Sequence, residues 1–193
     1  MKHMKQWLLV GIVAAMSLVL GGCGGGAPSP EMSKAIESQA PMYTQVGMWY
    51  EMNRKGVNIM NGTNYNVGVH VPVNTKVTVV GTTRNGVLVN VNGKEVEMIN
   101  ISKYTGLDNG AFMDRMLGKQ PVKLDKFSKV ERDAIAKGAL VKGMSKDAVI
   151  LSRGYPPSHA TPSLDGDRWR YWKNRWATMY VEFQNGKVSG FVE

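Results

Sequence analysis

The sequence predicts an α+β protein with two folded parts, a small N-terminal β-barrel and a C-terminal two-layer domain with the element order ααβββ. Residues 41–107 consist of short β-prone runs separated by turn residues. Residues 128–193 contain two segments with helix start and stop signals, followed by three runs of alternating residues. Helices that are segregated from antiparallel strands along the chain are typical of this fold class.

The first segment, residues 1–22, has the composition of a signal peptide. Lys2 and Lys5 precede 14 mostly apolar residues from Trp7 to Leu20, and small residues follow. A membrane-spanning helix needs about 20 apolar residues, and the glycines end this run well short of that. We therefore expect the segment to be removed, so that the mature chain begins at Cys23.

The run Leu20-Gly21-Gly22-Cys23 resembles the lipobox of bacterial lipoproteins. The resemblance implies that Cys23 carries a diacylglycerol on its sulfur and a further acyl chain, such as palmitate, on its amine, and two or more chains anchor a protein stably. Cys23 is the only cysteine, so lipidation also accounts for the single thiol of an exported protein. Gly24 stands where many inner-membrane lipoproteins carry aspartate. The expected location is therefore the outer membrane, lipid-anchored, on the periplasmic face.

Basic residues are concentrated in the C-terminal half of the chain. The formal net charge is +9, with 14 Lys and Arg against 8 Asp and Glu in residues 119–193, but 8 against 7 in residues 24–118. This charge favours contact with anionic lipid or an acidic protein surface. No basic run or nucleic-acid motif is present, so a nucleic-acid partner is not expected.

Residues 23–40 are predicted to form a lipidated, flexible tether. Residues 24–30 read Gly-Gly-Gly-Ala-Pro-Ser-Pro, a composition that buries little apolar surface. Within this tether, residues 31–40 are expected to form a short helix.

Residues 41–107 are predicted to form five short strands that close into a small barrel. Asn85-Gly86 and Asn92-Gly93 lie between consecutive runs, and Asn-Gly favours tight hairpins because both central residues adopt positive φ. The predicted strands are residues 48–52, 67–71, 76–80, 87–91 and 96–99.

The turn Pro72-Val73-Asn74-Thr75-Lys76-Val77, which enters the third of these strands, resembles bacterial SH3-like domains. The resemblance covers residues 41–107 and implies binding of peptides or cell-wall fragments. Trp49, Tyr50 and Tyr65 could then line a groove. The alternative is that these aromatic residues fill the small barrel's core, where aromatic side chains contribute much of the burial.

Residues 108–127 are predicted to be a connecting helix and linker. Phe112, Met113 and Met116 recur at helical spacing, with Asp108 as N-cap and Gly118 at the end.

Residues 128–193 contain the clearest local signals. Ser128 and Glu131 form a capping box for a helix that ends at Gly138, and a second helix begins at Ser145 and ends at Gly154. Three strands follow, at residues 167–173, 176–184 and 187–192, the last two joined by Asn185-Gly186. The predicted core is Met144, Val149, Leu151, Trp169, Tyr171, Val181 and Phe183.

This segment resembles the SmpA/OmlA (BamE-like) family. The motifs that carry the resemblance are, in order, residues 143–149 (Gly-Met-Ser-Lys-Asp-Ala-Val), 154–156 (Gly-Tyr-Pro), 169–172 (Trp-Arg-Tyr-Trp) and 181–188. It implies a non-enzymatic periplasmic lipoprotein connected with the assembly of outer-membrane proteins. The additional barrel before the shared domain departs from this family.

Alternation along the strands predicts a binding surface on the side of the sheet away from the helices. Arg168, Arg170, Trp172, Trp176 and Tyr180 would point outward there. Trp, Tyr and Arg are enriched at the energetic centres of protein interfaces. The surface would bind an envelope protein, unless the N-terminal barrel or the connecting helix covers it.

The sequence offers no catalytic arrangement. The only cysteine is the lipidation site, no Gly-x-Ser-x-Gly motif occurs, and His70 and His159 lack acidic neighbours at ligand spacing. Asp165 and Asp167 are too few for a calcium site. We therefore expect no enzyme activity, metal or cofactor. The predicted function is a protein-interaction module in outer-membrane protein assembly or envelope integrity. The alternative is a lipoprotein that binds peptidoglycan or peptides through its SH3-like domain.

Overall fold

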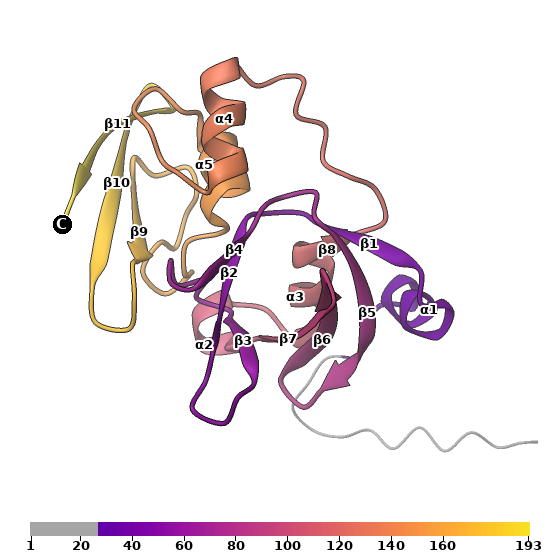
Figure 1. The fold of residues 1–193 in the computed structure, drawn as a ribbon. Coiled ribbons are helices and arrows are strands. Elements are labelled where there is room, and N and C mark those ends of the chain that lie inside the picture. Colours follow the sequence, from indigo (N-terminus) through magenta and orange to yellow (C-terminus); the bar gives the residue numbers. More distant parts are fainter. Residues whose placement is uncertain (1–26) are drawn as a thin grey trace, which may run out of the picture.

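The computed structural model describes residues 27–193 and has an α+β fold (Figure 1). A curled, mixed eight-stranded sheet comes first, and two helices, α4 (Lys129–Lys137) and α5 (Lys146–Arg153), and a three-stranded antiparallel sheet follow. The predicted signal segment, Cys23 and Gly24 lie outside the described residues.

The curled sheet is an open half-barrel, not the closed five-stranded barrel predicted from the sequence. Its edge strands, β4 (Val69–Val71) and β8 (Leu117–Gly118), have no mutual pairing. Strand β3 (Asn58–Asn61) pairs with β7 (Lys94–Ile99) in parallel, while all other neighbours are antiparallel. Strands β1, β3 and β8 were not predicted; each spans four residues or fewer, and their pairings join residues distant in the chain. In spatial order the strands are β4 (Val69–Val71), β2 (Met48–Met52), β3 (Asn58–Asn61), β7 (Lys94–Ile99), β6 (Gly86–Val91), β5 (Lys76–Thr83), β1 (Pro41–Thr44) and β8 (Leu117–Gly118).

Two Asn-Gly hairpins form as predicted, and a third differs. Asn92 and Gly93 have φ values of 51° and 82°, and Asn185 and Gly186 repeat this pattern at 53° and 73°. Between β5 and β6, however, Gly86 already belongs to the strand and pairs with Thr83. A Cβ at Gly86 would lie 1.8 Å from the Met98 carbonyl oxygen, so this glycine permits a close strand approach and not a turn.

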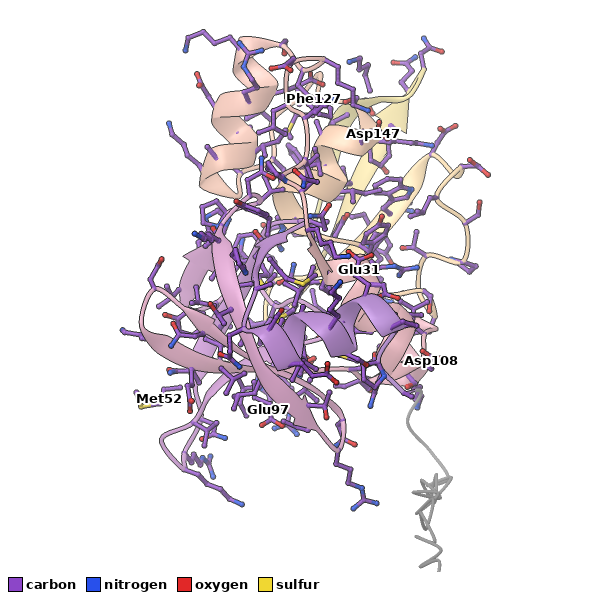
Figure 2. All side chains as sticks on the ribbon, turned by 90° about the vertical axis from the view of Figure 1, so that its right-hand side faces the viewer. Glu31, Met52, Glu97, Asp108, Phe127 and Asp147 are labelled. Atoms are coloured by element: carbon purple, nitrogen blue, oxygen red, sulfur yellow. The ribbon has the colours of Figure 1, made fainter. Side chains whose placement is uncertain are left out.

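Three helices complete the first part of the molecule: α1 (Pro30–Ser38), α2 (Ser102–Thr105) and α3 (Asn109–Met116). Figure 2 shows α1, which carries Glu31, lying across the curled sheet. Met32 and Ala35 of α1 are buried in the core of the sheet. The predicted tether therefore does not extend to residue 40, because this apolar helix face packs.

Helix α3 belongs to the same core and is more than a connector. Asp108 caps it as predicted, by accepting a hydrogen bond from the Ala111 N–H at 2.8 Å. Phe112, Met113 and Met116 are buried inside the curl. The chain then continues into β8, so the linker begins after Gly118.

The C-terminal part has the predicted order of two helices and three antiparallel strands. Its elements are α4 (Lys129–Lys137), α5 (Lys146–Arg153), β9 (Arg168–Trp172), β10 (Thr178–Gln184) and β11 (Lys187–Val192). The sheet order is β11-β10-β9, and the helices cover one face. All predicted core residues are buried except Leu151, which is half-buried because it lies at the edge of the cluster.

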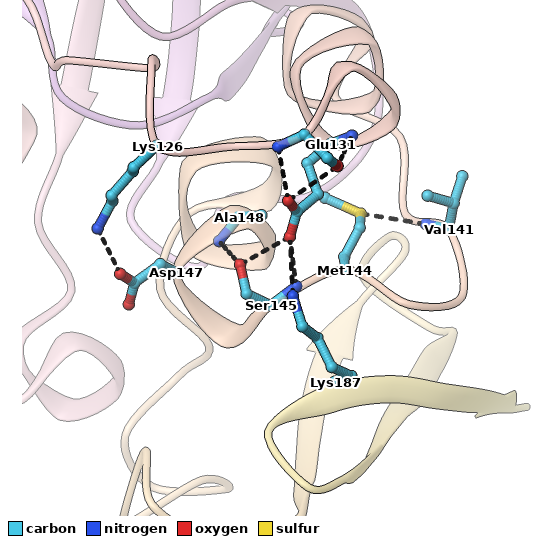
Figure 3. A network of polar contacts seen from close by, with 9 residues as sticks. Lys126, Glu131, Val141, Met144, Ser145, Asp147, Ala148 and Lys187 are labelled. Carbon is cyan, nitrogen blue, oxygen red and sulfur yellow. Dashed lines mark hydrogen bonds and ion pairs between the residues drawn. The ribbon is translucent and has the colours of Figure 1, made fainter.

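The carboxylate of Glu131 links the starts of both helices (Figure 3). One oxygen accepts hydrogen bonds from the Ser128 N–H and hydroxyl, both at 3.0 Å. The other accepts from the Ser145 N–H at 2.8 Å and the Ser145 hydroxyl at 2.9 Å, and Lys187 Nζ lies 3.5 Å away. The capping box is thus confirmed, and the same glutamate also fixes the N-cap of α5.

The two parts are joined where α5 ends. The Gly47 N–H donates to the Leu151 carbonyl at 2.8 Å, and Asn64 Nδ2 donates to the Arg153 carbonyl at 2.7 Å. Asn64 also accepts from the Trp49 N–H at 3.1 Å and donates to the Gly47 carbonyl at 2.9 Å. The C-terminal carbonyls of α5 are therefore satisfied by the curled sheet.

Candidate functional site

The side chains of β9 and β10 that point away from the helices form a continuous surface, which we call the outer sheet face. It consists of Arg168, Arg170, Trp172, Thr178, Tyr180 and Glu182. Antiparallel pairing places Arg168 opposite Glu182, Arg170 opposite Tyr180 and Trp172 opposite Thr178. Their neighbours Trp169 and Val181 are fully buried on the helix side, so the predicted alternation is confirmed.

Arg168 lies over a tyrosine ring at one end of this face. Its guanidinium carbon is 4.1 Å from the ring centroid of Tyr180. Its Nε is 3.5 Å from the carboxylate of Glu182, and both side chains of this ion pair are about half exposed (53% and 41%). An exposed pair of this kind contributes little to stability, so its charges are available to a partner.

Arg170 lies at the centre of the face, between two aromatic rings. Its guanidinium carbon is 4.9 Å from the centroid of Trp172 and 5.5 Å from that of Tyr180. One terminal nitrogen is 3.5 Å from the Thr178 hydroxyl, while Nε is buried with no hydrogen-bond partner in residues 27–193. The rings hold the guanidinium in place and leave part of its donor capacity unused.

The Trp172 end of the face is partly covered by the chain itself. The His159 ring centroid lies 5.3 Å from that of Trp172 and 4.8 Å from that of Tyr104 in α2. Ser158 fixes this loop, because its N–H and hydroxyl both donate to the Tyr104 carbonyl, at 2.8 and 3.0 Å. The side chain that covers the Trp172 edge is thus His159, from the loop after α5, and Tyr104 of the N-terminal part packs on His159.

Trp176 is separated from the other predicted site residues. It lies in the hairpin between β9 and β10, not in a strand, and is 85% exposed. Asn174 Oδ1 accepts from the N–H groups of Trp176 and Ala177 at 2.8 and 2.9 Å, so the hairpin is well defined. The structure therefore brings together four of the five predicted residues and places Trp176 beside them on a protruding turn.

Sequence reasoning missed His159 and Tyr104 as neighbours of this face. They are 55 positions apart in the chain and meet only through the packing of α2 against the loop after α5. No local pattern identifies such a pair.

The aromatic residues of the curled sheet do not form a groove. Trp49 and Tyr50 are each 6% exposed, and Tyr50 lies in the sheet's core. Tyr65 is half-buried. This agrees with the core interpretation for Trp49 and Tyr50.

Residues 27–193 contain no cluster of three or more His, Cys, Asp or Glu that could hold a metal ion. The Asp165 carbonyl accepts a hydrogen bond from Lys146 Nζ at 2.7 Å, and the same ammonium lies 3.8 Å from the Asp167 carboxylate. In the described part of the chain, no helix combines the length and apolarity needed to cross a bilayer.

Comparisons with protein-family models, curated proteins and solved structures found no match to this chain. What the outer sheet face can bind is therefore inferred from its geometry alone. Planar cations held against aromatic rings can stack on aromatic groups and donate to carboxylates of a protein surface.

Proposed function

We propose that this chain is a non-enzymatic outer-membrane lipoprotein whose C-terminal part acts as a periplasmic protein-interaction module in outer-membrane protein assembly or envelope integrity. The lipobox at Cys23 and the BamE-like order of motifs support this function. The ααβββ arrangement of residues 128–193 is compatible with that family's fold.

The observation that carries the proposal is the outer sheet face. Its arginines lie over the rings of Tyr180 and Trp172, and the helices of the same domain cover only the opposite side. Such preordered arginine and aromatic side chains lose little conformational entropy on binding, which is what a protein-docking surface needs.

The SH3-like interpretation of residues 41–107, with binding of peptidoglycan or peptides, has less support. Its candidate groove residues Trp49 and Tyr50 are buried. Sedimentation of the protein with purified peptidoglycan would favour that alternative.

Docking is tested by replacing Arg170 and Trp172 together with alanine and measuring co-purification with barrel-assembly subunits from membranes. If these residues are interface hot spots, partner affinity should fall by at least about 2 kcal/mol. Lys137→Ala, on the exposed side of α4, is the control and should bind normally. An unchanged affinity of the folded double variant would exclude the outer sheet face as the docking surface.

Anchoring is tested by Cys23→Ala. The variant should accumulate as an unprocessed precursor that incorporates no labelled fatty acid, because the acylated sulfur is missing. Normal labelling of the variant would contradict the lipoprotein assignment.

A further inference from the structure

A bare patch of backbone lies beside the outer sheet face, on edge strand β11. Gly190 of β11 pairs with Glu182 of β10. Val192 pairs with Tyr180 in the same way, and paired residues point to the same side of a sheet. In Figure 1, α4 and α5 lie on one side of this sheet, and no helix or strand of residues 27–193 covers the other. A ligand on this side can therefore contact all three strands.

Gly190 leaves open space on this side. Apart from its chain neighbours, a Cβ there would have no atom nearer than Glu182 Oε2 at 3.9 Å. Gly190 follows the bulge between β10 and β11, but its φ is not in the left-handed region that favours glycine. Neither crowding nor backbone geometry therefore requires a glycine here, and a glycine within a strand permits close approach of another chain. Val192, 39% exposed, adds apolar surface two positions further on.

Arg168 provides accessible donors close to this space. The nearest approach of its neighbour Glu182 is to Nε, at 3.5 Å, and the Arg168 side chain is 53% exposed. The Tyr180 ring holds the guanidinium over β10, with its carbon 4.1 Å from the ring centroid. Neighbouring strands are about 4.8 Å apart, so one short segment can contact both this guanidinium and Gly190 on β11.

The charge of this side favours an acidic ligand. The outer sheet face carries Arg168 and Arg170 against one carboxylate, Glu182. The adjoining hairpin adds Arg175, whose guanidinium carbon lies 5.0 Å from the ring centroid of the exposed Trp176. Like charges suppress wrong partners, and opposite charges speed encounter with the right one.

We propose that the outer sheet face and Gly190 together bind an extended segment of a partner protein, in which a glutamate is followed two residues later by an apolar residue. The glutamate carboxylate accepts hydrogen bonds from the terminal nitrogens of Arg168, and the apolar side chain lies on Gly190 beside Val192. Side chains two positions apart on an extended segment point the same way and are about 7 Å apart, which suits two neighbouring strands. This inference rests on the docking function proposed above and names the chemistry of the partner.

The probe is the peptide acetyl-Ser-Glu-Thr-Leu-Ser amide, compared with the same peptide carrying glutamine in place of glutamate, and binding is followed by ¹⁵N NMR of the protein. The acidic peptide should shift the amide signals of Tyr180, Gly190 and Val192. It should bind at least about fivefold more tightly than the glutamine peptide, and Arg168→Gln should remove this preference. Equal binding of the two peptides, or shifts confined to other surfaces, would overturn the proposal.

A matched pair of glycine variants tests the space on β11. Gly190→Val fills it without a clash and should weaken binding of the acidic peptide at least about fivefold. Gly81→Val is the control, because Gly81 in β5 of the curled sheet also has no atom within 4 Å of a Cβ and no positive φ. Its affinity should stay unchanged, and thermal unfolding confirms that both variants fold. Equal affinities of the two variants would contradict contact at Gly190.

Vesicles of equal parts phosphatidylglycerol and phosphatidylcholine test the lipid alternative. Vesicle binding that is lost in Arg168→Gln and kept in Gly190→Val, without binding of the acidic peptide, would assign the arginines to lipid headgroups and overturn the proposal. Co-purification separates this inference from the docking function. If barrel-assembly subunits are lost from the double variant of Arg170 and Trp172 but retained by Gly190→Val and Arg168→Gln, docking stands and the acidic segment is wrong. If the double variant retains them, the docking function itself is wrong.

Discussion

The two cores of this protein are built from different side chains. The core cluster of the curled sheet contains seven buried methionines and many valines, and among the described residues Phe112 and Tyr50 are its only buried aromatic members. The C-terminal core instead centres on Phe127, Trp169, Tyr171 and Phe183, with Met144 as its one fully buried methionine. Unbranched methionine adapts to irregular spaces, whereas aromatic rings require a defined geometry. The first core should therefore tolerate substitution better than the second.

The largest expected effect is in the aromatic core. Phe183→Ala removes a ring that is 6% exposed and packs against Trp169 with centroids 4.7 Å apart. The free energy of unfolding should fall by about 3–5 kcal/mol, measured by chemical denaturation. A loss below about 1 kcal/mol would show that this core is as adaptable as the first one.

A smaller effect is expected at the polar link between α4 and α5. Glu131→Ala leaves the donors of Ser128 and Ser145 without their shared acceptor, which should cost about 2–3 kcal/mol. Glu131→Gln keeps the shape of the side chain but cannot accept all four hydrogen bonds, so it should be intermediate. Equal stability of all three proteins would mean that the network does not connect the helices energetically.

The same carboxylate predicts a dependence of stability on pH. Hydrogen bonds from Ser145 and Ser128 outweigh burial and hold the pKa of Glu131 at about 2, below the ordinary value of 4.5. Its contribution is therefore fully present above pH 4.5 and is lost as the pH falls towards 2. Denaturation at pH 6 and pH 3 should show this loss in the natural protein and not in Glu131→Gln.

The smallest effect is expected in the methionine core. Met98→Leu conserves volume at a fully buried position of β7, so it should cost less than about 1.5 kcal/mol. Met144→Leu is the matched change in the aromatic core, where less room for adjustment predicts a larger loss. The reverse order of the two losses, measured by denaturation, would contradict the comparison between the cores.

The two parts also differ in how much the sequence predicts. In residues 128–193 the signals are local: Ser128 and Glu131 begin a helix, Gly138 ends it, and Asn185-Gly186 turns one strand into the next. These signals act over a few residues, so they can be read without knowing the fold.

In the curled sheet, the decisive pairings join distant residues. The parallel pair of β3 and β7 and the pairing of β1 with β8 have no local signature, so an open sheet was predicted as a closed barrel. The placement of the arginines follows the same rule. Alternation predicts Arg170 and Tyr180 on one face, but nothing local places Arg153 against Trp49.

The junction at the end of α5 has a consequence for how the molecule can be oriented. Gly47 leaves no space for a side chain, because a Cβ there would lie 2.3 Å from the Ser152 carbonyl oxygen. The Asn64 side chain joins the same two segments by donating to the carbonyl oxygens of Gly47 and Arg153. At the other end of the curled sheet, Ala27 lies against Gly110 of α3. The position of Ala27 is thus fixed relative to the direction in which Arg168 and Tyr180 point. Through this junction, the curled sheet sets the direction in which the outer sheet face is presented.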